Sequence, residues 1–355
     1  MSTETLSIGK DIVVNQARIA GIVSCVPKQT VTNETFASRF EPEALASVIK
    51  MIGVQTRRQT DANTTTSDLC AAAGEVLLQK LNWAVDSVDA IIFVSQTPDH
   101  VLPATACVLQ RELKLSQANI AFDVNLGCSG YVYALWLGMT MIQSGAANRV
   151  LLAVGDTVSK IVNPTDRATA LLFGDAGTMT ALERSDNAND VCRFVLGSDG
   201  TGAKNLIVPE GAFRAAPVKQ DAAGQALDQH HLYMDGGEIF NFTLRTIPAL
   251  VARLLAFSGS NIAEQDYFLF HQANLFMLNH LVKKIKIPKE QAPINIEEYG
   301  NTSSASIPLL MTTRLRNELL SKALKLNLFG FGVGYSWGGA ALSVGPLRCV
   351  ETIER

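Results

Sequence analysis

The stretch Asn125-Leu-Gly-Cys-Ser-Gly-Tyr-Val-Tyr-Ala-Leu-Trp-Leu-Gly-Met-Thr-Met-Ile142 decides how this chain folds. From Tyr131 onward it is apolar nearly all round a helix rather than along one stripe, and such a helix is buried on every side. The simplest architecture that supplies this burial is a sandwich of two sheets, with helices between the sheets as well as outside them.

Apolar runs of strand length alternate with helical patterns along the chain, which is typical of an α/β protein. The runs form two sets of three with similar order and spacing, at residues 90–94, 120–124 and 150–154 and at residues 267–270, 294–296 and 326–329. This self-similarity indicates an internal duplication. We place the boundary near residue 187, so that residues 1–187 form the N-terminal repeat and residues 188–355 the C-terminal repeat. An irregular surface excursion is expected at about residues 185–231.

The composition excludes several classes of function. The 355 residues include 30 Lys and Arg against 33 Asp and Glu, which gives a net charge of −3 and no basic field for nucleic acid or an anionic membrane. The longest apolar stretch, residues 131–142, is shorter than the roughly 18 residues of a membrane-spanning helix. The six cysteines form no CxxC pair, and the five histidines lack zinc-ligand spacing. We expect a cytoplasmic protein with reduced thiols and no metal site.

Three polar side chains from the two repeats are expected to meet. Cys128 lies at a strand-to-helix turn, where the helix dipole and free N–H groups favour a thiolate and can hold an oxyanion. His271 follows the apolar run 267–270, and Asn301 occupies the turn that corresponds to that of Cys128. Because the repeats pack about a pseudo-twofold axis, these positions converge and predict one site. Taken singly, they are also explained as a buried thiol, a structural histidine and a turn asparagine.

The stretch Gly334-Tyr-Ser-Trp-Gly338 fits the G-x-S-x-G pattern of serine hydrolases. Those enzymes need a histidine after the serine, but no histidine follows His280. The neighbouring glycines also fail the dinucleotide-binding pattern G-x-G-x-x-G. We interpret this glycine-rich loop as a place where backbone N–H groups approach a substrate carbonyl.

Motifs along nearly the whole chain resemble those of the β-ketoacyl-acyl-carrier-protein synthase III family of the thiolase superfamily. They are Gly127-Cys-Ser-Gly130, Asn163-Pro-Thr-Asp-Arg167, Leu172-Phe-Gly-Asp-Ala-Gly177, His271-Gln-Ala-Asn-Leu275, Tyr299-Gly-Asn-Thr-Ser-Ser-Ala-Ser306 and Ser336-Trp-Gly338. The resemblance implies a thiolase-like five-layer αβαβα sandwich built from two pseudo-repeats. It also implies a homodimer and a Cys-His-Asn triad at Cys128, His271 and Asn301.

The activity that this resemblance implies is a decarboxylative Claisen condensation without a bound cofactor. Cys128 takes an acyl group from acyl-coenzyme A or an acyl carrier protein, and malonyl-acyl-carrier protein then loses carbon dioxide and attacks the acyl-cysteine. His271 and Asn301 would stabilise the enolate, while the N–H groups of Cys128 and Val333 would hold the oxyanion. Two alternatives stay open. The acyl group could pass to a hydroxyl or amine without decarboxylation, or the chain could be an inactive scaffold subunit of a condensing-enzyme complex.

Three further residues are assigned to substrate binding through the resemblance. Arg167 matches a usual contact to the adenine of coenzyme A, and Asn274 lies in the His-Gln-Ala-Asn-Leu motif. Leu102 stands where the family often has a Phe that reaches across the dimer into the acyl pocket. The smaller side chain predicts tolerance of acyl groups longer than acetyl.

Other positions depart from the family pattern or concern the carrier. Ser47 and Met51 stand where a Trp and an Arg usually line the coenzyme A entrance, and Phe276 replaces an Arg after the histidine motif. Lys283 and Lys284 keep a basic pair, which predicts a docking site for an acidic acyl carrier protein.

Overall fold

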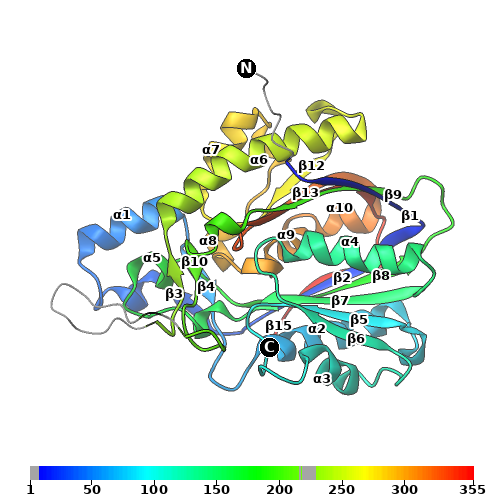
Figure 1. The fold of residues 1–355 in the computed structure, drawn as a ribbon, viewed down its shortest axis with the longest axis horizontal. Coiled ribbons are helices and arrows are strands. Elements are labelled where there is room, and N and C mark those ends of the chain that lie inside the picture. Colours follow the sequence, from blue (N-terminus) through cyan, green and yellow to red (C-terminus); the bar gives the residue numbers. More distant parts are fainter. Residues whose placement is uncertain (1–7, 216, 218–228) are drawn as a thin grey trace.

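The computed structural model describes residues 8–215, 217 and 229–355, which form two stacked sheets with helices between and outside them (Figure 1). The first sheet has six strands in the order β15 (Cys349–Glu354), β2 (Ala17–Val26), β8 (Ala176–Arg184), β7 (Arg149–Asp156), β5 (Ala90–Val94) and β6 (Ile120–Val124). The second sheet has five strands in the order β1 (Lys10–Asn15), β9 (Val191–Ser198), β14 (Ser336–Val344), β13 (Leu324–Gly332) and β12 (Tyr267–Phe270).

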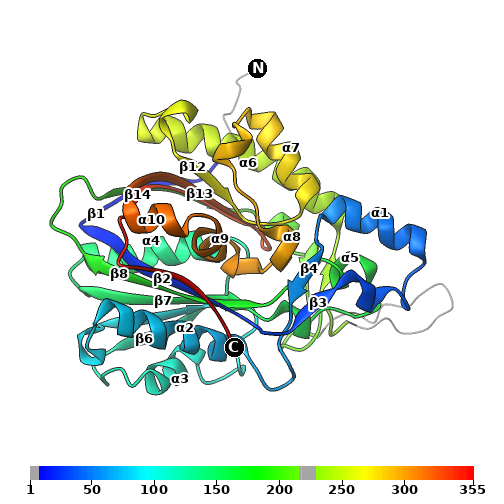
Figure 2. The same ribbon diagram turned by 180° about the vertical axis from the view of Figure 1, so that it is seen from behind.

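Helices complete five layers, which both views of the ribbon show (Figures 1 and 2). The outer helices on the first sheet are α2 (Thr66–Leu81) and α3 (Thr105–Glu112). The inner helices are α4 (Gly130–Gln143) and α9 (Ser306–Arg314), followed by the short α10 (Arg316–Ser321). The outer helices on the second sheet are α6 (Gly236–Ser258) and α7 (Leu275–Ile285). The αβαβα sandwich expected from the sequence is therefore confirmed.

Shorter elements gather at one end of the layers (Figures 1 and 2). They are β3 (Thr30–Thr32), α1 (Pro42–Ile52), β4 (Thr56–Arg58), α5 (Arg167–Ala170), β10 (Leu206–Ile207), β11 (Tyr233–Met234) and α8 (Ile296–Tyr299). The 3-10 turns are η1 (Asn33–Phe36), η2 (Val85–Ser87), η3 (Val158–Lys160), η4 (Gly200–Gly202), η5 (Ile262–Glu264), η6 (Lys289–Gln291) and η7 (Ser303–Ala305).

Strand β5 shows why the predicted strands are apolar without alternation. Ala90, Ile92 and Val94 belong to the core cluster around α4, whereas Ile91 and Phe93 belong to the cluster under α2 and α3. Successive side chains of a strand point to opposite faces, so a strand that is covered on both faces needs an apolar residue at every position.

The all-round burial predicted for residues 131–142 holds for one side of α4 and in part for the other. Tyr131, Leu135 and Met139 are fully buried between the two sheets. Trp136 and Leu137 pack against the same cluster but are only partly buried in the single chain. Helix α4 therefore joins the two sheets and keeps one apolar side near the surface.

Two outer strands cross the proposed boundary at residue 187. Strand β1, from the N-terminal part, pairs with β9 in the second sheet, and β15, from the C-terminal end, pairs with β2 in the first. The division into residues 1–187 and 188–355 stays a prediction, and the sheets themselves do not divide strictly at that point.

Part of the surface excursion expected over residues 185–231 is wrong. Residues 191–198 form β9, which lies between β1 and β14, and its Phe194 is fully buried. Its eight residues did not stand out from the polar stretches on either side. Residues 216 and 218–228 of the expected excursion lie outside the described residues.

The strand expected at residues 294–296 is also wrong, because side chains satisfy the backbone there in place of a neighbouring strand. The carbonyl of Ile294 accepts a hydrogen bond from Arg314 Nε at 2.8 Å, and the N–H of Asn295 donates to Gln272 Oε1 at 3.1 Å. The other five predicted runs lie in β5, β6, β7, β12 and β13.

Helix α6 is, among the described residues, the one helix long and apolar enough to cross a membrane by length and composition. In this fold it lies over the second sheet, where Phe242, Leu250 and Leu254 are buried in the core. Packing on the sheet accounts for its apolar side.

The close packing of α4 makes a stability prediction. Alanine normally favours a helix over glycine by about 1 kcal/mol. A Cβ added at Gly138, however, would lie 2.7 Å from Leu182 Cδ1 and 3.0 Å from Leu152 Cδ2 in the fully buried core. We expect Gly138→Ala to lower the free energy of unfolding by about 1–3 kcal/mol, measured by urea titration.

Gly237→Ala in α6 is the matched control, since its added Cβ meets only Asp235 Oδ1, at 3.4 Å. This variant should keep or raise the stability, by up to about 1 kcal/mol. Equal effects of the two substitutions would contradict the close approach of α4 to the first sheet.

Candidate active site

Cys128 lies in the turn between β6 and α4, with 8% of its surface exposed. Two glycines allow other segments to approach it. A Cβ at Gly127 would meet Gln96 Oε1 at 2.3 Å, and a Cβ at Gly332 would lie 2.7 Å from Cys128 Cβ and 3.0 Å from its Sγ. The end of β13, where the glycine-rich loop begins, therefore lies against the cysteine.

His271 directly follows β12 and is buried. Its N–H donates to the carbonyl of Phe329 at 2.8 Å, which continues the pairing of β12 with β13. The imidazole stands edge-on to the Phe331 ring, with centroids 5.6 Å apart, and its Nδ1 lies 2.8 Å from Ser306 Oγ. The ring is therefore held both by packing and by a hydroxyl of α9.

Asn301 is held by backbone pairing with the segment that precedes β8. Its N–H donates to Leu172 O at 2.9 Å, and Gly174 N donates to Asn301 O at 3.1 Å. Its side chain donates from Nδ2 to Ala273 O at 3.3 Å and accepts from the N–H of Ser303 at 2.9 Å. The Leu-Phe-Gly-Asp motif thus serves to position Asn301.

Two cavities meet at the cysteine, because both are lined by Cys128, Phe173 and Leu206. The smaller, of about 70 Å³, is also lined by His271 and Asn301. The larger, of about 720 Å³, lies beside Cys128 and is lined by neither of these two residues. The structure therefore brings the three predicted residues to one cavity and adds a second cavity that the sequence did not indicate.

Burial controls the charge of the site. It raises the pKa of the Cys128 thiol to about 12. Hydrogen bonds from Ser303 and from the backbone N–H groups of Cys128 and Val333 oppose this rise, because they stabilise the thiolate. Burial also lowers the pKa of His271 to about 3. Both groups are uncharged at neutral pH. The backbone donors favour the thiolate, as the sequence indicated, but desolvation outweighs them, so the thiol keeps its proton in the resting state.

Asp156 is a buried carboxylate that was not among the predicted residues. Its Oδ1 accepts hydrogen bonds from Ser95 Oγ at 3.0 Å and Gln96 N at 2.7 Å, and its Oδ2 accepts from Ser304 Oγ at 2.7 Å. Burial raises the pKa of Asp156, while these bonds oppose that rise. Ser95 directly follows β5, and Asp156 is the last residue of β7. A polar residue at the end of an apolar run is the sequence signal that could have indicated both positions.

The predicted substrate residues lie in different places. Asn274 lines the smaller cavity, and its Oδ1 accepts from Met277 N at 2.8 Å as the cap of α7. Arg167 instead lines a separate pocket of about 390 Å³ together with Arg39. Leu102 is 77% exposed, and its neighbour Val101 lines the larger cavity.

The other predicted positions lie on the surface. Lys283 and Lys284 are exposed in the last turn of α7, and Lys284 Nζ donates to Leu244 O at 2.7 Å. Ser47 and Met51 are exposed on α1. Phe276 packs on Phe240 and His280, with ring centroids 5.5 and 4.1 Å away.

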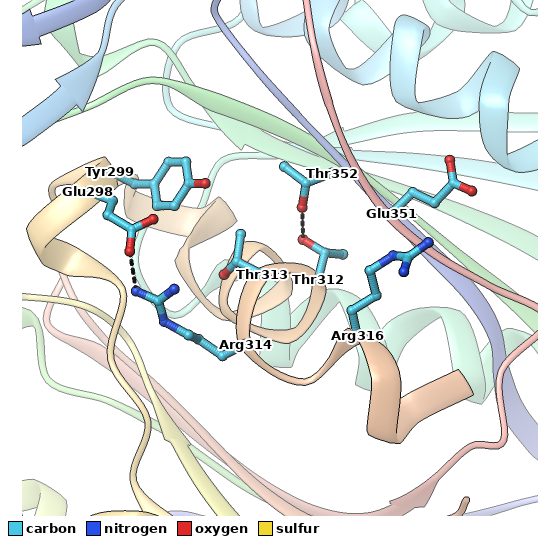
Figure 3. Close-up of a pocket in the computed structure, with 8 residues that line it drawn as sticks. All are labelled: Glu298, Tyr299, Thr312, Thr313, Arg314, Arg316, Glu351 and Thr352. Carbon is cyan, nitrogen blue, oxygen red and sulfur yellow. Dashed lines mark hydrogen bonds and ion pairs between the residues drawn. The ribbon is translucent and has the colours of Figure 1, made fainter. Parts of the chain in front are cut away.

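A polar depression of about 490 Å³ lies near β15 and α8–α10, apart from the cysteine. Two pairs of its polar side chains bind one another, as Figure 3 shows: Arg314 pairs with Glu298 at 2.5 Å, and Thr352 donates to Thr312 at 2.9 Å. It contains none of the predicted site residues. Across residues 8–215, 217 and 229–355, no group of three or more His, Cys, Asp or Glu side chains is placed to hold a metal ion.

This fold and site define a thiolase-like α/β protein with a Cys-His-Asn centre. Two family profiles match the chain: 3-oxoacyl-[acyl-carrier-protein (ACP)] synthase III over residues 122–200, and the C-terminal part of the same synthase over residues 255–344. The chain belongs to the β-ketoacyl-[acyl-carrier-protein] synthase III family.

Individual relatives agree over nearly the full length. The β-ketoacyl-[acyl-carrier-protein] synthase III of Clostridium perfringens is 32% identical over 93% of this chain and 100% of its own. That of Rhodopirellula baltica is 33% identical over 91% and 97% of the two chains. The crystal structure of a 3-oxoacyl-(acyl-carrier protein) synthase from Burkholderia xenovorans LB400 is 58% identical, with a TM-score of 0.95 over 99% of this chain and 100% of that chain.

The lowered pKa of His271 predicts a pH dependence of stability. An unfolded histidine has a pKa near about 6.5. Between that value and about 3, the unfolded chain binds one proton more than the folded chain, so this contribution to stability is lost as the pH falls below about 6.5. His271→Gln should therefore show a smaller loss of unfolding free energy between pH 7 and pH 5 than wild type, by about 1–2 kcal/mol.

The measurement is urea unfolding at pH 5, 6 and 7. Phe331→Leu is the control, because it loosens the packing of the same imidazole without removing the titrating group. It should lose stability equally at each pH relative to wild type. If the unfolding free energy of His271→Gln fell with pH as steeply as that of wild type, His271 would not be buried in its neutral form.

Proposed function

We propose that this protein condenses an acyl thioester with malonyl-acyl-carrier protein through an acyl group on Cys128, releasing carbon dioxide and giving a β-ketoacyl thioester. The observation that carries the proposal is the meeting of two cavities at Cys128. One cavity can hold the acyl chain, while the other brings a second thioester past His271 and Asn301. The family to which the chain belongs supports the same reaction.

In the first half-reaction, Cys128 Sγ attacks the thioester carbonyl of the acyl donor. The new bond is an S-acyl bond to Cys128, the bond to the carrier sulfur breaks, and the proton of the Cys128 thiol ends on the departing thiol. The N–H groups of Cys128 and Val333, which already favour negative charge on this sulfur, donate to the oxyanion of the tetrahedral intermediate.

In the second half-reaction, malonyl thioester loses carbon dioxide and leaves an enolate. Asn301 Nδ2 and the neutral His271 ring donate to the enolate oxygen. His271 Nδ1 lies 2.8 Å from Ser306 Oγ. We assign the Ser306 hydroxyl as the donor in this contact, because the ring then carries its proton on Nε2 and can donate it to the enolate. The enolate carbon then attacks the acyl carbonyl, the bond to Cys128 breaks, and the sulfur takes up a proton.

The alternatives weighed from the sequence are less well supported. Transfer to a hydroxyl or amine would leave the paired donors of His271 and Asn301 without an enolate to stabilise. An inactive scaffold would have no need of the close approach of Gly332 to Cys128, which leaves no room for a Cβ.

Cys128→Ala tests the nucleophile. Wild type incubated with acyl thioesters should gain the mass of one acyl group, and Cys128→Ala should gain none, as measured by mass spectrometry of the intact protein. Wild type should also release carbon dioxide from malonyl-acyl-carrier protein in step with β-ketoacyl product. An adduct that persists in Cys128→Ala would exclude this cysteine, and product without carbon dioxide would favour simple acyl transfer.

The larger cavity supports an acyl chain longer than acetyl. Its volume is about 720 Å³, and its wall includes Val158, Ile161, Val208 and Leu232. Each buried methylene contributes about 0.8 kcal/mol, or about fourfold in rate. We expect kcat/KM for acylation of Cys128 to rise about two- to fourfold per methylene between acetyl and hexanoyl donors.

A series of acyl donors scored by the mass of the acyl-enzyme measures this effect. Ile161→Trp should fill the cavity and remove the gain for the longer chains, while acetyl transfer stays near the wild-type rate. A wild-type rate that is highest for acetyl would contradict this use of the cavity.

Partner recognition is proposed from the surface. Lys283 and Lys284 lie in the last turn of α7, and together with Lys286 and Lys289 they form an exposed basic cluster. The N-cap of the same helix, Asn274, lines the smaller cavity. An acidic acyl carrier protein fits this cluster. We assign coenzyme A or carrier-protein thioesters as substrates, no bound cofactor or metal, and a cytoplasmic location.

We also infer a homodimer through β6. This strand is the edge of the first sheet, and Ile120 is 43% exposed. Trp136, Leu137 and Met141 of α4 lie only partly buried in the single chain. A second copy would cover this edge and these side chains. The exposed Leu102 would then be free to reach the partner's larger cavity.

A further inference from the structure

Two buried hydroxyls connect the cysteine turn to the glycine-rich loop. Ser129 Oγ lies 2.6 Å from Ser336 Oγ, and Ser336 Oγ donates to the carbonyl of Val333 at 2.9 Å. Ser129 is fully buried, and Ser336 is 6% exposed. Ser129 directly follows Cys128, whereas Ser336 begins β14, so the contact spans the two sheets.

The direction of this hydrogen-bond chain follows from the number of protons. The Ser336 hydroxyl has one proton, which goes to the Val333 carbonyl. Ser129 must then be the donor in the contact between the two hydroxyls. The chain runs from Ser129 through Ser336 to the carbonyl of Val333, in the peptide that links Val333 to Gly334.

The turn at Val333 lies outside the strand ladder, so other contacts must hold its backbone in place. The last ladder pair of β13 and β14 is Gly332 with Ser336, so the residues between them stand outside the ladder. Gly334 at the tip is exposed and has a positive φ of 135°. On one flank, Tyr335 is held by backbone bonds with Asp199 at 2.7 and 2.9 Å. On the other flank, the Ser336 hydroxyl holds the Val333 carbonyl.

The N–H of Val333 is one of the backbone donors that lower the pKa of the Cys128 thiol against its burial, and Val333 lines the larger cavity together with Cys128. A donor of this kind works only when it points at the position of the developing oxyanion. This N–H belongs to the peptide from Gly332 to Val333, whereas the carbonyl that Ser336 holds belongs to the next peptide, from Val333 to Gly334. The two peptides meet at the Val333 Cα, so the held carbonyl, together with the ladder pair at Gly332, limits the rotation that would turn the N–H away.

We propose that the Ser129–Ser336 hydroxyl pair is a positioning device for the oxyanion hole, and this inference rests on the proposed function of Cys128. The pair ties the two donors, the N–H groups of Cys128 and Val333, into one unit. Ser129 and Ser336 are positioning residues, since they act through Val333 and do not touch the reacting atoms.

This role predicts that only some steps of the reaction depend on the pair. Acyl transfer to Cys128 and attack on the acyl-cysteine both pass through a tetrahedral oxyanion at this hole. Decarboxylation of malonyl thioester instead makes an enolate at His271 and Asn301. A loosened hole should therefore slow the first two steps and leave decarboxylation unchanged.

The experiment measures both kinds of step in Ser129→Ala, Ser336→Ala and the double variant. Acylation is followed in a single turnover by the mass of the acyl-enzyme. Loss of an oxyanion donor costs about 10²–10³-fold, so a loosened donor should cost about 10–100-fold in Ser336→Ala, with less in Ser129→Ala and little change in KM. The double variant should match Ser336→Ala, because both substitutions break one chain.

Decarboxylation is measured as carbon dioxide release from malonyl-acyl-carrier protein in the Cys128→Ala background, and it should keep its rate when Ser336→Ala is added. Ser336→Thr keeps the hydroxyl and should restore acylation to within about threefold of wild type. Wild-type acylation in both single variants, or equal losses in acylation and decarboxylation, would overturn the proposal.

Ser24→Ala is the matched control. Ser24 is fully buried and accepts a hydrogen bond from Thr312 Oγ1 at 2.8 Å, between β2 and α9. Its loss removes a comparable hydroxyl pair without a link to Val333, so acylation should stay at the wild-type rate. If wild type itself neither forms an acyl-enzyme nor releases carbon dioxide, the proposed function fails, and that result is distinct from failure of the serine pair.

Discussion

The enclosure of α4 between two sheets is the constraint on which the active site depends. Because the helix begins inside the molecule, the turn that leads into it places Cys128 between the sheets rather than on the surface. Strand β13 of the second sheet can then come close enough for Gly332 to lie against the cysteine, where a Cβ would stand 3.0 Å from Sγ. The positions of the proposed nucleophile and of its proposed oxyanion donors both follow from this one placement.

The same enclosure sets the electrostatics. A Cys128 thiolate paired with a protonated His271 would lose much of its hydration between the sheets. Burial therefore keeps both side chains neutral at rest. The carboxylate of Asp156 adds to this effect, since its charge also raises the pKa of Cys128. Charge therefore arises only during the reaction, where fixed N–H donors meet it. A site of this kind depends more on the exact direction of its donors than on resting charges.

The sequence predicts the layers and the three central residues because these follow from local pattern and order. Runs such as 90–94 are apolar at every position, and Cys128 and Asn301 stand in corresponding turns. It does not predict what depends on contacts between distant segments. Three features could not be predicted without knowing which surfaces meet. They are the desolvation of the Cys128 thiol, the pairing of Asp156 with Ser304 and the path of residues 294–296. Strand β9 was missed for another reason, since polar stretches on both sides concealed it.

Contacts between distant parts of the chain explain why motifs without reactive groups surround the three residues of the proposed site. The segment at Phe173 bridges to Asn301, Asp156 accepts from Ser304, and Ser129 meets Ser336. Each contact joins a segment before residue 187 to a segment after it. The proposed site does the same, because Cys128 lies before that residue while His271 and Asn301 lie after it. The relative placement of these segments therefore decides whether the three side chains meet, and these polar contacts fix it where apolar packing alone would allow small shifts.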